Sequence, residues 1–323
     1  MISKLPQALL ALSMSILLLS CASSEQKQPP PVLIEQADKT ISSGVFSYNQ
    51  SDYAKAEELF TRALSRYRGI DNPEGVASSC INLAKTRLSQ GDVNAARQWI
   101  DSARHVIETG ELNHLNNHVT IVSSSIAIES QDYDAAKQLL APLLNDADKT
   151  IDKPTRLAAL QNRTRIAFAE NSEAAVWAER YSKQVTPDYP LHQARLARFR
   201  AALATDDESG SAQFNIALDI YRKQASRPGI ASTLSEWAQS EIEYHHYNSA
   251  INKLERALFI RAELMDRGNC REILAALKRA YTNTNDADRL TITGSWIEKL
   301  DSTGFHQWPE LAEVYSPFPD SGI

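Results

Sequence analysis

Two histidines have the spacing of metal ligands. His114 and His118 lie four residues apart, and on a helix this spacing places both imidazoles on one face. Asn113, Asn116 and Asn117 surround them, which indicates a connector, and no third ligand is near in the sequence. We interpret the two histidines as exposed turn and capping residues. A metal-dependent hydrolase centred on this pair is the catalytic alternative.

Other catalytic patterns are missing from the sequence. It contains no glycine-rich phosphate loop, no serine nucleophile elbow and no metalloprotease helix. The carboxylates Glu57, Glu58, Glu236, Glu241 and Glu243 belong to amphipathic segments, where we interpret them as solvated faces rather than acid–base pairs. We therefore predict no enzymatic activity, no cofactor and no bound metal.

The chain contains an internal repeat whose period is 40 residues. A polar turn followed by three apolar anchors occurs as Ser51-Asp52-Tyr53 with Ala56, Phe60 and Ala63; as Gly91-Asp92-Val93 with Ala96, Ile100 and Ala103; and as Gln131-Asp132-Tyr133 with Ala136, Leu140 and Leu143. The anchors are spaced i, i+4 and i+7, as on one stripe of a helix. The first turn residue suits a helix C-terminus and the Asp suits the N-terminus of the next helix. Each unit is therefore predicted to be a helical hairpin.

This pattern resembles the tetratricopeptide-repeat family, in a variant with longer units. The turn recurs at Thr205-Asp206, His245-His246 and Asn285-Asp286, again 40 residues apart. The resemblance implies an all-α, right-handed α-α superhelix of about seven helical hairpins. Sustained two-residue alternation of apolar and polar residues is missing, so we predict no sheet.

One unit departs from the period. The turns at 131 and 205 are 74 residues apart rather than 80, which predicts a shortened unit around Leu157 to Gln184. Pro73, Pro154, Pro190 and Pro228 fall in connectors or first turns, where proline is tolerated. Pro142 instead falls inside the second helix of the third unit and is expected to kink that helix or end it early.

Two cysteines fall within the array, Cys80 in the second unit and Cys270 in the seventh. Stacked repeats contact their sequence neighbours, so we expect the two thiols to lie far beyond bonding distance. We interpret both as small buried side chains.

The N-terminus resembles the signal peptide of bacterial lipoproteins. Lys4 precedes an apolar run from Ala8 to Leu19, which is too short to span a bilayer. The run closes on Leu18-Leu19-Ser20-Cys21, which looks like the lipobox in which the cysteine is acylated. The resemblance implies lipidation of Cys21. It also implies the outer membrane, facing the periplasm, because Ala22 follows rather than aspartate; an inner-membrane lipoprotein is the alternative.

Composition predicts a tether and excludes one class of partner. Residues 23–31 are polar and rich in proline, a composition that cannot bury a core. The whole chain carries 34 Lys and Arg against 40 Asp and Glu, a net charge of −6. Nucleic-acid binding draws on clustered cations, so we predict no nucleic acid as partner. The predicted division is a signal peptide at 1–20, the lipidated cysteine and tether at 21–32, a repeat array at 33–303 and a tail at 304–323.

In the repeat family the first helix of each unit lines the concave face. This resemblance implies that the partner-binding side chains are Asn82, Lys85, Ser125, Glu129, Arg195, Phe199, Glu236, Gln239, Glu243 and Arg279. Only Asn82 and Lys85 match the places of a carboxylate clamp, so such a clamp is not supported. Phe199 lies between Arg195 and Arg198, where it is either an aromatic anchor or a core residue. The tail at 304–323, interrupted by prolines, is expected to cap the array; binding a partner is its alternative role.

We therefore expect a membrane-anchored envelope lipoprotein that serves as a non-catalytic scaffold or adaptor, with a protein or peptide ligand in the periplasm. It would serve envelope assembly, secretion or pilus formation, or a peptidoglycan-related complex. An intracellular repeat sensor that binds a peptide or a response regulator is the alternative if the lipobox is false.

Overall fold

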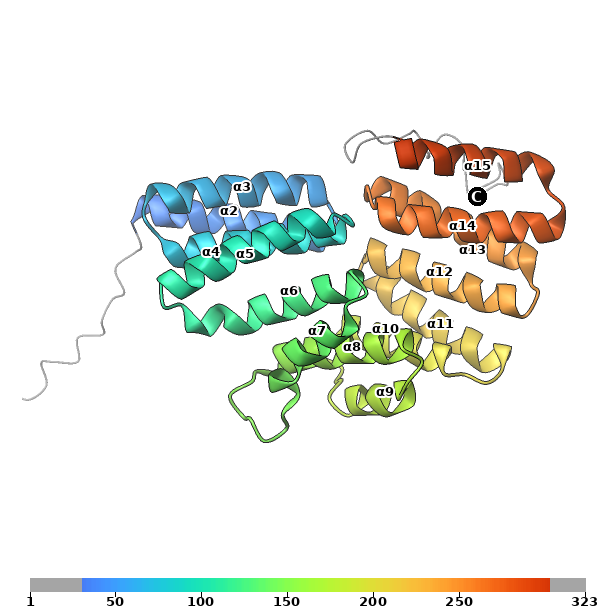
Figure 1. Ribbon diagram of the computed structural model, residues 1–323, viewed down its shortest axis with the longest axis horizontal. Coiled ribbons are helices and arrows are strands. Elements are labelled where there is room, and N and C mark those ends of the chain that lie inside the picture. Colours follow the sequence, from blue (N-terminus) through green and yellow to red (C-terminus); the bar gives the residue numbers. More distant parts are fainter. Residues whose placement is uncertain (1–30, 303–323) are drawn as a thin grey trace, which may run out of the picture.

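The computed structural model describes residues 31–302, which form fourteen α-helices and no β-strand (Figure 1). The helices are α2 (Val32–Asn49), α3 (Tyr53–Gly69), α4 (Pro73–Ser89), α5 (Val93–Thr109), α6 (Asn116–Glu129), α7 (Tyr133–Leu140), α8 (Lys153–Ala169), α9 (Ala174–Ser182), α10 (Pro190–Ala202), α11 (Asp207–Lys223), α12 (Arg227–Glu243), α13 (Tyr247–Glu263), α14 (Arg267–Thr284) and α15 (Ala287–Ser302). Two short 3-10 turns, η1 (Asn113–Leu115) and η2 (Pro142–Leu144), lie between them.

Successive helices pack in pairs, so the described chain is an all-α helical-repeat superhelix of seven hairpins. The pairs run from α2 with α3 to α14 with α15. The predicted register is confirmed, and the shortened unit is the hairpin of α8 and α9. The predicted lipidation site Cys21, the tether and the tail at 304–323 lie outside the described residues. Between residues 31 and 302, no helix has the length and apolar character needed to cross a membrane.

The turns explain the period. Residues with left-handed backbone recur every 20 residues, at 51, 71, 91, 111 and 131 and again at 225, 245, 265 and 285. At each one the next backbone N–H donates to the carbonyl five residues earlier, as Asp52 does to Ser47 at 2.9 Å and Asp92 does to Arg87 at 2.9 Å. This bond closes the helix C-terminus with its Schellman pattern. One helix and one turn therefore occupy 20 residues, and a hairpin occupies 40.

The aspartates of the turns begin the next helices, as predicted. The carboxylates of Asp52, Asp92 and Asp132 accept hydrogen bonds from backbone N–H groups three residues later, at 3.0, 3.0 and 3.1 Å. An N-cap of this kind stabilises a helix by about 1 kcal/mol. The alanines of the stripe are fully buried and the larger anchors between them are nearly so, so the stripe predicted from the sequence faces the interior of each hairpin.

The first helices of the hairpins form the inner layer. α2 contacts α4, α4 contacts α6, α6 contacts α8, and α12 contacts α14, whereas the second helices mainly contact the helices before and after them in the chain. Helices that contact their counterparts in the next unit lie at the smaller radius of a curved array. We call the surface of these first helices the inner face.

The second and seventh hairpins touch, which corrects the expectation that repeats contact only their sequence neighbours. A methyl group placed on Gly91, in the turn between α4 and α5, would lie 3.5 Å from the backbone nitrogen of Gly268 and 3.6 Å from Asp266 Oδ1. In Figure 1 the turn between α4 and α5 lies on the side of its hairpin that faces the start of α14. We call this contact of Gly91 with Asp266 and Gly268 the seam. The curvature of seven hairpins brings the two ends of the array together.

Buried charge lies directly at the seam. Asp266 caps α14 as its counterparts do, but it is only 1% exposed. Its carboxylate pairs with Arg261 at 2.7 Å, and Arg261 also donates to the Ser232 hydroxyl at 2.5 Å. Across the same region, burial and then the charge of Glu129 in α6 raise the pKa of Glu272 in α14. The predicted state of Cys80 and Cys270 is confirmed, since both thiols are free and buried.

Candidate functional site

Polar and aromatic contacts link the first helices along the inner face. Asn162 of α8 donates to the hydroxyls of Ser124 and Ser125 in α6, at 3.0 and 2.9 Å. Arg165 of α8 pairs with Glu129 at 2.6 Å. Nearer the N-terminus, the hydroxyls of Tyr48 in α2 and Ser89 in α4 are 2.9 Å apart. Each contact joins residues from neighbouring units, so the inner layer is held together by side chains as well as by apolar packing.

The same pattern continues through α10. Arg195 donates to Gln161 of α8. Arg198 pairs with Glu236 of α12, its Nε lying 2.8 Å from Oε2. The ring of Phe199 stacks on Phe168 of α8 with centroids 5.3 Å apart. Of the ten predicted partner-binding residues, five therefore make contacts within the chain: Ser125, Glu129, Arg195, Phe199 and Glu236.

The side chains of the other five make no hydrogen bond or ion pair with any residue between 31 and 302. They are Asn82 and Lys85 on α4, Gln239 and Glu243 on α12, and Arg279 on α14. Glu243 and Arg279 are exposed, and Asn82, Lys85 and Gln239 are half-buried. The predicted set is thus divided between residues that join units and residues whose side chains make no such contact.

Lys85 lies among helices rather than on an open face. Burial lowers the pKa of Lys85. Burial and then the charge of Lys85 lower the pKa of His118 at the start of α6. A cation in such a place favours an anionic neighbour, and only the charge of Asp152 acts on His118 in the opposite direction.

The histidine pair is not gathered into a metal cluster. His114 lies in η1 with its Nε2 3.0 Å from Glu74 Oε1, and His118 lies in α6. No group of three His, Cys, Asp or Glu residues suited to a metal ion occurs within the described part of the chain. The interpretation of Glu241 as a solvated carboxylate is wrong, because Glu241 is 6% exposed and pairs with Lys253 at 2.6 Å.

A pocket lies where the repeat is irregular. α7 and α9 have 8 and 9 residues, against 17 in α3, α5, α11 and α13. Pro142 accounts for the first of these, since α7 ends at Leu140 and η2 begins at the proline. The expectation that Pro142 ends its helix early is thus confirmed. Because α7 and α9 have about half the length of the other second helices, the segment 145–152 occupies part of the outer layer. A cavity of about 450 Å³ remains beside it.

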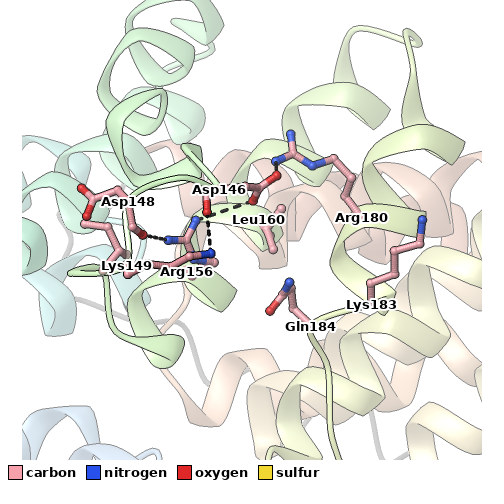
Figure 2. A pocket seen from close by; sticks show the side chains of 9 residues that line it. Asp146, Asp148, Lys149, Arg156, Leu160, Arg180, Lys183 and Gln184 are labelled. Carbon is pink, nitrogen blue, oxygen red and sulfur yellow. Dashed lines mark hydrogen bonds and ion pairs between the residues drawn. The ribbon is translucent and has the colours of Figure 1, made fainter.

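We call this cavity the notch pocket. Its lining residues are Asp146, Asp148, Lys149, Ile151, Arg156, Leu160, Arg180, Lys183 and Gln184. In Figure 2 the side chains of α8 and of α9 with the residues after it face each other across the opening, with the 145–152 segment over one side. Its size falls within the range of ordinary ligand sites, about 300–1,000 Å³.

Arg156 holds the segment over the pocket. Its guanidinium donates to the carbonyls of Asn145 at 3.0 Å and Asp148 at 2.5 Å. Arg180 donates to the Leu144 carbonyl at 3.3 Å and to Asp146 Oδ2 at 3.0 Å. Both arginines therefore use some of their N–H groups to hold the 145–152 segment and the residues just before it. The loop is positioned by charged side chains of the helices that flank it.

The charges that line the pocket are not balanced. Four cations face two carboxylates. The side chain and backbone of Thr150 donate to Asp148 and lower the pKa of that carboxyl. Asp146 is occupied by Arg180. The Lys183 ammonium lies 3.6 Å from Glu179, a carboxylate outside the lining, and Lys149 donates to the Asp146 carbonyl at 3.0 Å. Two lysines therefore remain without a carboxylate inside the pocket.

Sequence reasoning located the irregular unit but not this pocket. The signal was present as Pro142, the shortened spacing and four cations between 149 and 183. Those cations are up to 34 residues apart, so only the packing of α8 against α9 brings them together.

Comparisons with known proteins add little to this description. No protein-family model matches the chain, and no curated protein matches it. Among solved structures, the crystal structure of BtubC (BKLC) from P. vanneervenii is 17% identical, and the match covers 85% of this chain and 95% of that chain with a TM-score of 0.33. Values this low say nothing about what this chain binds.

Proposed function

We propose that this protein is a lipid-anchored adaptor of the bacterial cell envelope, which binds a protein or peptide through its helical array and catalyses no reaction. The observation that carries the proposal is the division of the inner face. Half of the predicted residues tie the units together, and the other half, such as Gln239 and Glu243, make no polar contact with the described residues. A rigid array with available polar side chains suits a binding surface.

The anchor is the second part of the proposal. The Leu18-Leu19-Ser20-Cys21 segment supports acylation of Cys21, and Ala22 supports the outer membrane facing the periplasm. Each buried methylene contributes about 0.8 kcal/mol, so several acyl chains would hold the protein on the membrane. The adaptor would then act close to the lipid surface.

Metabolic labelling tests the anchor. Wild-type protein is expected to incorporate radiolabelled palmitate, and the Cys21→Ala variant is expected to incorporate none. Equal labelling of both proteins, or of neither, would remove the anchor and favour the intracellular sensor.

Site-specific crosslinking in cells tests the adaptor. A photoreactive residue at Gln239, on the inner helix α12, is expected to capture a defined protein. Asn252 is the matched control, because it is an exposed residue of α13 in the same hairpin. Capture of the same proteins with equal yield from both positions would contradict binding on the inner face.

A further inference from the structure

We propose that the notch pocket binds a carboxylate-bearing segment of a partner polypeptide. This inference rests on the proposed function, since it names the kind of peptide that the adaptor recognises. It concerns the outer layer of the third and fourth hairpins rather than the inner face.

The charge of the pocket selects an anion. Lys149, Arg156, Arg180 and Lys183 outnumber Asp146 and Asp148 by two, in a chain whose net charge is −6. The carboxyl of Asp148 is already satisfied by Thr150. Glu179, which lies outside the lining, is 3.6 Å from Lys183. A ligand that brings one negative charge would therefore neutralise the excess that remains, and charge-assisted hydrogen bonds are the stronger kind.

The geometry favours a carboxylate. Arg180 already binds the carboxylate of Asp146 at 3.0 Å, and that aspartate side chain is 74% exposed. An arginine of the pocket therefore already pairs with a carboxylate, and a carboxylate of the ligand can compete with Asp146 for Arg180. Phosphate sites are commonly built from glycine-rich backbone N–H groups, and the lining of this pocket contains no glycine.

The rest of the lining suits a peptide. Ile151 and Leu160 are the apolar residues of the lining and can contact a side-chain stem, and Gln184 supplies an amide that donates and accepts. Figure 2 shows Gln184 directed into the opening between Arg156 and Lys183. A volume of about 450 Å³ accommodates a few side chains rather than a whole domain.

Fluorescence anisotropy with the full-length protein in detergent micelles tests this inference. The probe is a labelled peptide of alternating Glu and Ser with blocked ends, and the same peptide with Gln in place of Glu is the neutral comparison. Wild-type protein is expected to bind the Glu peptide at least tenfold more tightly, and added salt is expected to weaken that binding because the charges are near the surface.

Charge reversal locates the binding. The double variant Lys149→Glu with Lys183→Glu is expected to lose on the order of tenfold in affinity, equivalent to about 1.4 kcal/mol. Both lysines are exposed, so folding is expected to be preserved. Lys223→Glu with Lys278→Glu is the matched control, since these two exposed lysines on α11 and α14 lie outside the pocket.

Three results would overturn the inference. They are equal affinity for the Glu and Gln peptides, equal losses in the pocket and control variants, and displacement of the Glu peptide by inorganic phosphate but not by acetate at the same concentration. Crosslinking from Gln239 is unaffected by any of them, so failure of the pocket is distinguished from failure of the adaptor.

Discussion

The second helix of the second hairpin and that of the third begin alike and end differently. Asp92 and Asp132 cap α5 and α7 in the same way, yet α5 runs for 17 residues and α7 for 8. Position 102 in α5 is Ser and the equivalent position 142 is Pro. The regular hairpins close on one another at the seam, and the irregular hairpins open the notch pocket. An early stop of the second helix thus leaves a cavity where the regular hairpins are filled by the rest of that helix.

The largest effect is expected at the seam between regular hairpins. Arg261→Ala leaves the Asp266 carboxylate buried without its cation, which is expected to lower the free energy of unfolding by about 3–5 kcal/mol. Denaturant unfolding measures the loss. Arg271→Ala is the control, because its pair with Asp301 is exposed and contributes about 0–1 kcal/mol. Similar losses in both variants would show that the seam is not specially stabilised.

The second prediction exchanges the residues that distinguish the two hairpins. Ser102→Pro is expected to destabilise the protein by about 3 kcal/mol, because proline in the middle of α5 removes a hydrogen bond and clashes with the preceding turn. Pro142→Ser is expected to change stability by less than about 1 kcal/mol, since the helix already ends there. Denaturant unfolding with circular dichroism measures both. A large loss from Pro142→Ser would mean that the proline itself holds the pocket loop.

The third prediction concerns pH near the irregular hairpins. Burial and then the charge of Arg195 lower the pKa of His192 to about 4, below the ordinary 6.5. Its Nδ1 lies 2.5 Å from the Tyr181 hydroxyl. As the pH falls, the unfolded chain takes up a proton at His192 before the folded protein does. The contribution of His192 to the free energy of unfolding is therefore complete above pH 6.5 and is lost as the pH drops toward 4. Because His192 is partly exposed, the expected loss in the free energy of unfolding is on the order of 2 kcal/mol.

Unfolding measured across this pH range, in wild type and in His192→Gln, checks the third prediction. The variant is expected to depend less on pH. His105→Gln, at an exposed position on α5, serves as the control. A wild-type slope that the His192 substitution leaves unchanged would assign the effect to another group.

The smallest effect is expected at Gly91. Its φ is +80°, where a side chain is strained, so Gly91→Ala is expected to cost about 1 kcal/mol. Gly268→Ala, on the other side of the seam, is expected to cost nothing, because a methyl group there meets no atom within 4 Å and alanine favours the helix. Thermal unfolding of both variants separates backbone strain from crowding at the seam.

Much of the fold was predictable because it is local. The left-handed residue at 51, 91 and 131 and the capping Asp that follows it depend only on their own turn. The break at Pro142 is local in the same sense. The sequence did not show which residues of the inner face contact neighbouring units and which do not, because contacts such as Arg165 with Glu129 join side chains 36 residues apart.

The sequence by itself determined the 40-residue period, the hairpins and the place where the period fails, since helix caps, turn conformations and apolar stripes are set by neighbouring residues. Tertiary structure decided the seam, the burial of Arg261 with Asp266, and the gathering of four cations at the notch pocket. Those features depend on the rotation accumulated over several hairpins. The packing of each helix pair contributes to that rotation, and no single turn encodes it.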